Sequence, residues 1–121
     1  MKRRKTDTAS WESVCEIANA MPEAVEGKSY GTPAFFVRKK LFVRFHQSGE
    51  SIVINMHMNE RSHFMKIDPD TFFITDHYLN YPYMLVRLST VRREDLKKLI
   101  EESWRRCAPP DLISFFDQKS K

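Results

Sequence analysis

The sequence predicts an α+β domain in two layers, with an antiparallel sheet and helices packed on one face of it. Two observations carry this prediction: a helical pattern near each end of the chain, and a middle segment in which apolar and polar residues alternate. At 121 residues, 41% of them hydrophobic, the chain is long enough to bury one core. We therefore predict a single domain over residues 1–121, with a loose leader at 1–8 and a frayed tail at 117–121.

Apolar residues recur at helical spacing in two segments. The first stripe consists of Trp11, Val14, Cys15, Ala18 and Met21. The second stripe consists of Leu96, Leu99, Ile100, Trp104 and Cys107. Thr8 or Ser10 can cap the first helix and Pro22 ends it, whereas Pro109 and Pro110 end the second. Because both stripes contain Trp and Cys, we expect both helices on the same face of the sheet.

The segment between the helices predicts strands over 25–30, 34–38, 41–46, 52–57, 71–74 and 84–88, and a short helix over 59–66. Strict alternation predicts a set of apolar residues beneath the helices: Leu41, Val43, Phe45, Ile52, Ile54, Met56, Val86 and Leu88. It predicts that the opposite face carries Phe42, Arg44, His46, Val53, Asn55, His57 and Arg87.

Several classes of protein are disfavoured by what the sequence contains. No apolar run follows the basic N-terminus, so we predict a cytoplasmic protein without a membrane segment. Cys15 and Cys107 lie on apolar stripes and predict buried reduced thiols, although a single long-range disulfide stays open. Without a glycine-rich phosphate loop, a nucleophile elbow or a paired-cysteine motif, we expect neither an enzyme nor a cofactor. His57, Glu60 and His63 match no zinc spacing, so we expect no metal.

Basic residues suggest one possible function. The formal net charge is +4, and residues 31–61 hold five basic and two acidic side chains. Arg38, Lys39, Lys40 and Arg44 have no acidic neighbour before Glu50, and Lys2, Arg3, Arg4 and Lys5 add to them. These residues predict weak, non-specific and salt-sensitive contact with nucleic-acid backbone. The alternative is that they are solvated charges that protect an exposed strand edge.

The basic residues of the last helix receive a different interpretation. Glu94 and Lys98, Glu101 and Arg105, and Glu102 and Arg106 are each four residues apart with the acid first. This spacing predicts ion pairs within the helix rather than a binding face.

Two polar and aromatic loops suggest the second possible function. Tyr30 lies in one loop, and Asp76, His77 and Tyr78 lie in the other. If the loops approach the sheet face that carries Arg44 and Arg87, they predict a pocket for a small anionic ligand or a peptide. The alternative is that Tyr30 and Tyr78 are half-buried anchors of their loops. We expect a monomer in either case.

Short signatures occur in a fixed order along the chain: Pro22-Glu23, Ser29-Tyr30-Gly31-Thr32-Pro33, Lys40-Leu41-Phe42, Asp68-Pro69, Thr75-Asp76-His77-Tyr78, and Ser103-Trp104 before Ala108-Pro109. Together, from about Trp11 to Pro109, they resemble the MmcQ/YjbR family of small bacterial proteins. The resemblance implies a two-layer fold similar to frataxin (CyaY) and to secretion chaperones. It also implies the family's frequent label of DNA binding, and it implies no catalytic residues. One departure is Lys39, where the family often has glycine in the turn.

Overall fold

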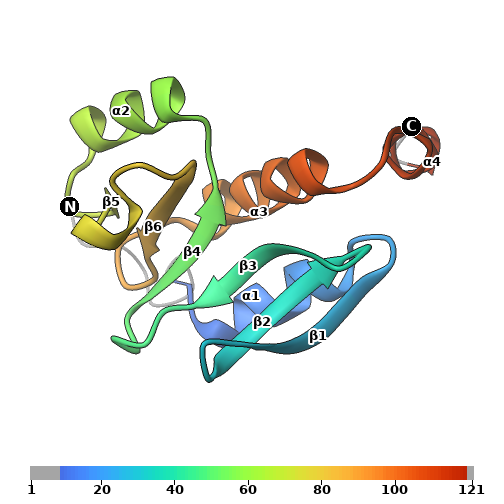
Figure 1. The fold of residues 1–121 in the computed structure, drawn as a ribbon, viewed down its shortest axis with the longest axis horizontal. Coiled ribbons are helices and arrows are strands. Elements are labelled where there is room, and N and C mark those ends of the chain that lie inside the picture. The colour runs from blue at the N-terminus through green and yellow to red at the C-terminus, as the bar shows by residue number, and fades with distance from the viewer. Residues whose placement is uncertain (1–8, 120–121) are drawn as a thin grey trace.

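The computed structural model describes residues 9–119, so the predicted leader at 1–8 and its four basic residues lie outside the described part of the chain. The elements, in chain order, are α1 (Trp11–Asn19), β1 (Ala24–Ser29), β2 (Thr32–Val37), β3 (Lys40–Phe45), β4 (Ser51–Asn55), α2 (Met58–Ile67), β5 (Phe72–Phe73), the 3-10 helix η2 (Asp76–Tyr78), β6 (Tyr83–Arg87), α3 (Arg93–Cys107) and α4 (Pro110–Lys119) (Figure 1). The helix α4 includes residues 117–119, which we expected to be a frayed tail.

The strands form one antiparallel sheet in the order β1-β2-β3-β4-β6-β5. Helices α1 and α3 pack together on one face of it, so the predicted α+β architecture is confirmed (Figure 1). Every residue of the predicted α3 stripe is buried, including Trp104, whose ring nitrogen donates a hydrogen bond to the carbonyl of Pro22, 3.1 Å away. Ser10 caps α1 as predicted, through a reciprocal exchange of hydrogen bonds with Ser13. Among residues 9–119, no helix is long and apolar enough to cross a membrane.

The predicted alternation fails in β3, and the side-chain amide of Asn55 at the end of β4, predicted on the face opposite the helices, instead reaches Ser103 and Cys107 of α3. Phe35 pairs with Val43 and Phe36 pairs with Leu41, so Phe42 is an extra residue in a β-bulge. The bulge puts Phe42 and Val43 both in the core beneath the helices, whereas Leu41 lines a cavity together with Arg44. The predictions for Leu41 and Phe42 were therefore wrong, because a strict two-residue period cannot anticipate an inserted residue. The other residues predicted beneath the helices belong to this core, with Phe45 at its margin.

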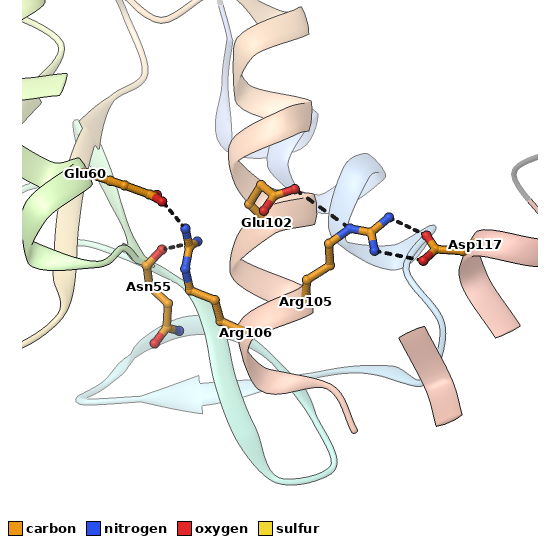
Figure 2. A network of polar contacts seen from close by, with 6 residues as sticks. All are labelled: Asn55, Glu60, Glu102, Arg105, Arg106 and Asp117. Carbon is orange, nitrogen blue, oxygen red and sulfur yellow. Dashed lines mark hydrogen bonds and ion pairs between the residues drawn. The ribbon is translucent and has the colours of Figure 1, made fainter. Parts of the chain in front are cut away.

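The arginines of α3 form contacts with other elements, which corrects the prediction of pairs four residues apart. Arg105 binds both carboxylate oxygens of Asp117 on α4, at 2.6 and 3.3 Å, and approaches Glu102 at 3.8 Å (Figure 2). Arg106 binds Glu60 on α2 at 3.0 Å and the carbonyl of Asn55 at 3.1 Å (Figure 2). These side chains therefore connect α3 to α4, α2 and the end of β4.

Candidate functional site

The sheet face opposite α1 and α3 contains a cavity of about 310 Å³. Its walls come from the turn between β1 and β2, from β3 and β4, and from the segment 77–83. The lining residues are Tyr30, Leu41, Arg44, Val53, His77, Tyr78, Tyr81 and Tyr83. A cavity of this volume lies at the lower end of the range for small-molecule sites.

Arg44 provides the charge of the cavity and is only 3% exposed. Its position on β3, opposite Val53 of β4, directs it away from the helix layer. One terminal nitrogen donates to the hydroxyl of Thr32 at 3.2 Å and to the side-chain oxygen of Gln47 at 3.3 Å, and the other donates to the hydroxyl of Tyr78. No carboxylate of residues 9–119 lies within 4.0 Å of this guanidinium. Arg44 is therefore a buried cation held by neutral partners.

Tyr30 forms the rim of the cavity on the side of β1 and β2. Tyr30 and Gly31 have φ angles of 53° and 77°, which define a type I′ turn. Glycine tolerates this left-handed conformation, but tyrosine is strained in it. Tyr30 is nevertheless 84% exposed, and its ring centre lies 5.5 Å from the Arg44 guanidinium carbon. It is therefore not the half-buried anchor of the alternative interpretation, whereas Tyr78, which is buried, fits that description.

The opposite rim of the cavity is held by a residue that the sequence analysis did not identify. Arg61 on α2 is buried and donates to four backbone carbonyls, those of Tyr78, Leu79, Tyr81 and Tyr83, at 2.7 to 3.1 Å. These bonds fix the segment that supplies four of the lining residues. Nothing in the local sequence distinguishes Arg61 from a surface cation, because its partners are backbone atoms distant along the chain.

Of the second loop, His77 and Tyr78 line the cavity and Asp76 does not. His77 lines it and packs edge-on against the ring of Tyr78, with 4.9 Å between ring centres. Within residues 9–119, Asp76 forms neither a hydrogen bond nor an ion pair with His77, and it does not line the cavity. Arg87 lies outside the cavity too, stacked over Phe73 and bonded to the carbonyl of Asp70 at 2.7 Å. The structure therefore brings together Tyr30, Arg44, His77 and Tyr78, but not Asp76 or Arg87.

The pKa shifts of Tyr83 and His46 bear on the charge around Arg44. Burial raises the pKa of Tyr83, so its hydroxyl stays protonated and able to donate a hydrogen bond. Burial, with a further contribution from Arg44, lowers the pKa of His46, which directly follows β3. The lowered pKa makes His46 less often positively charged, whereas the guanidinium of Arg44, which lines the cavity, stays protonated at neutral and mildly acidic pH.

The four residues predicted to contact nucleic acid do not form one surface. Arg38 binds both oxygens of Glu23, at 2.6 and 2.9 Å, which lowers the pKa of that carboxyl. Arg44 is buried in the cavity, so Lys39 and Lys40 are the exposed members without an ion-pair partner in the described chain. Arg38 and Lys39, with φ angles of 48° and 70°, form a second type I′ turn, so the absence of glycine at Lys39 is accommodated with strain.

Metal ligands and reactive thiols are the two remaining kinds of reactive group that residues 9–119 could provide. No group of three or more His, Cys, Asp or Glu within residues 9–119 is placed to hold a metal ion. Cys15 and Cys107 are free thiols rather than a disulfide, and burial raises the pKa of both. This shift disfavours the reactive thiolate form.

The fold and part of the sequence are shared with known proteins. A crystal structure of Deinococcus radiodurans protein DR2400, with a DUF419 domain, superposes with a TM-score of 0.70 at 14% identity, over 84% of this chain and 80% of that one. The uncharacterized proteins Mb2600 of Mycobacterium bovis and Rv2570 of Mycobacterium tuberculosis are 41% identical over 49 residues, which is 40% of this chain. The match spans only 38% of the length of these relatives.

The comparison with protein families covers the larger part of the chain. A sequence model of the YjbR family matches residues 19–106, which extend from the end of α1 to the end of α3 and include every residue that lines the cavity. The chain belongs to the YjbR family.

Proposed function

We propose that this domain is a binding module whose cavity takes a small planar anion, a carboxylate or a phosphate on a ring. The single observation that carries the proposal is Arg44, a buried guanidinium with no carboxylate partner among residues 9–119. A charge removed from water is unfavourable unless it is paired. An anion in the cavity offsets that penalty, because it supplies the opposite charge next to the buried guanidinium.

The aromatic lining supports the planar part of the ligand. Four of the eight lining residues are tyrosines, and His77 adds a fifth ring. Tyr30 holds its ring above Arg44 in a strained backbone conformation, and such strain tends to persist where it serves a site. A flat ligand between the two rims would contact these rings while its anionic end approached Arg44.

The proposal is tested with three probes that separate charge from shape. Benzoate is planar and anionic, acetate is anionic only, and benzamide is planar but neutral. We expect benzoate to raise the thermal midpoint more than either other probe. A ligand at a hundred times its Kd stabilises a protein by about 2.7 kcal/mol, which a thermal scan resolves readily. NMR shifts of the residues lining the cavity, followed in the same titration, locate the binding.

The test variant and its matched control are two arginine substitutions on the same sheet face. Arg44→Met removes the cavity charge, and Arg87→Met removes the same charge at a position outside the cavity. We expect benzoate binding to disappear in the first variant and to persist in the second. Equal binding of benzoate and benzamide, or equal losses in both variants, would contradict the proposal.

Nucleic-acid binding at the turn between β2 and β3 stays a prediction, supported there by Lys39 and Lys40 alone. The test is the double variant Lys39→Glu/Lys40→Glu, measured against duplex DNA at low and physiological salt. Loss of a weak, salt-sensitive affinity in this variant, with benzoate binding unchanged, would establish a second surface. No affinity at low salt in the unmodified protein would exclude it.

A further inference from the structure

The strand β1 forms one end of the sheet and presents a free edge. The sheet order places β2 on one side of β1 and no strand on the other, and Figure 1 shows β1 along the outer margin of the molecule. Glu26, Lys28 and Val25 are exposed, and Val25 is 60% exposed although it is apolar. Neither Glu26 nor Lys28 has an ion-pair partner among residues 9–119.

The hairpin fixes which backbone groups this edge offers. The two-residue turn at Tyr30-Gly31 joins Ser29 to its partner Thr32, and such a turn closes on a hydrogen-bonded pair. Because hydrogen-bonded and non-bonded pairs alternate in an antiparallel ladder, Ser29, Gly27 and Val25 direct their N–H and C=O groups toward β2. Glu26 and Lys28 therefore direct theirs outward, and no backbone hydrogen bond outside the sheet engages their N–H groups among the described residues.

We propose that two copies of this chain pair through their β1 edges, antiparallel about a two-fold axis at Gly27. In this register Glu26 of each copy lies opposite Lys28 of the other, and these are the residues whose backbone groups point outward. The two sheets then continue into one, with Gly27 facing its own symmetry mate.

Charge selects this register over its neighbours. Moving the two-fold axis by one residue toward the N-terminus puts Glu26 opposite Glu26, and moving it the other way puts Lys28 opposite Lys28. Opposite charges facing each other across a strand pair are favourable, and like charges are unfavourable. The register centred on Gly27 is thus the one that forms two favourable pairs, and it also sets the exposed Val25 against Ser29 of the second copy.

The charge pattern of β1 differs from that of an edge strand that is protected against pairing. Charged residues on an edge strand commonly oppose pairing. Here, however, the two charges are of opposite sign and are spaced two residues apart around a glycine, which makes the edge complementary to itself. Charges of one sign would instead repel the same charges of a second copy.

The experiment is sedimentation analysis of the full chain over a range of concentrations, with charge-reversal variants. We expect a reversible dimer for the unmodified protein. Glu26→Lys faces lysine with lysine, and Lys28→Glu faces glutamate with glutamate, so each should weaken the dimer roughly tenfold or more. The double variant Glu26→Lys/Lys28→Glu restores opposite charges and should dimerise again.

A mixture provides the sharpest control. When the Glu26→Lys and Lys28→Glu proteins are combined one to one, every pair across the axis again joins opposite charges, so a heterodimer should form. Circular dichroism and thermal midpoints establish that each variant is folded. A monomer at every concentration, a dimer unaffected by either reversal, or a mixture that stays monomeric would overturn the proposal.

Discussion

Replacing Tyr30 by asparagine should make the protein more stable and its cavity weaker at binding. The left-handed conformation at φ 53° costs a non-glycine residue about 1–2 kcal/mol. Asn-Gly is the pair that type I′ turns favour, so Tyr30→Asn relieves most of this strain. The change also removes the contact of the Tyr30 ring with Arg44, worth about 0.5–1 kcal/mol at an exposed site. Because Tyr30 is 84% exposed, little buried area is lost.

The balance of these terms is a gain of up to about 1.5 kcal/mol in the free energy of unfolding, with a midpoint of about 0.75 kcal/mol, which corresponds to a rise of roughly 3–5 °C in the thermal midpoint. Loss of one aromatic contact should weaken benzoate binding about three- to tenfold. Urea unfolding measures the first effect, and NMR titration with benzoate measures the second.

The second type I′ turn supplies the matched control. Lys39 has a φ of 70° and does not line the cavity, so Lys39→Gly should relieve strain in the same way without changing benzoate affinity. If Tyr30→Asn were less stable than the unmodified protein, strain would not be the dominant property of Tyr30. If both variants bound benzoate normally, Tyr30 would not be a contact of the ligand.

Three further predictions concern stability. Arg61→Met leaves the carbonyls of the 78–83 segment without their donor and should lower the free energy of unfolding by about 2–4 kcal/mol, measured by urea titration, with faster proteolysis at that segment; a neutral effect would exclude its role as a clamp. Ser103 is fully buried; its hydroxyl accepts a hydrogen bond from the N–H of Asn55 and donates one to the carbonyl of Phe42, the bulged residue of β3. Ser103→Ala should therefore lower the free energy of unfolding by about 1–3 kcal/mol, measured by urea titration. A smaller loss would show that these two hydrogen bonds do not stabilise the bulge. Since Arg38 lowers the pKa of Glu23 in the folded state, the stabilisation exists above the ordinary pKa of a glutamate and is lost as the pH falls through the lowered value. The stability difference between the unmodified protein and Glu23→Gln, from urea midpoints at pH 7 and pH 3, should therefore shrink at the lower pH, and a constant difference would contradict this linkage.

The candidate site was predictable only in part. The residue types of the two aromatic loops suggested Tyr30, His77 and Tyr78, and alternation placed Arg44 on the face that the loops reach. The same reasoning included Asp76 and Arg87, because a sequence does not show how far along a strand or around a turn a side chain lies from a cavity. Arg61 was missed, because backbone carbonyls carry no sequence signature.

What the sequence determined by itself is the set of periodic elements. Each apolar stripe and each cap is a pattern within one short segment. A stripe predicts which face of its helix is buried before the packing partner is known, and every residue of the α3 stripe is buried. Tertiary structure decided the bulge at Phe42, the burial of Arg44 without a carboxylate, and the position of β1 at the end of the sheet. These three features depend on strand pairing between residues distant in the chain. Pairing is selected by the packing of the whole core rather than by local propensity, which is the physical reason that no single segment encodes them.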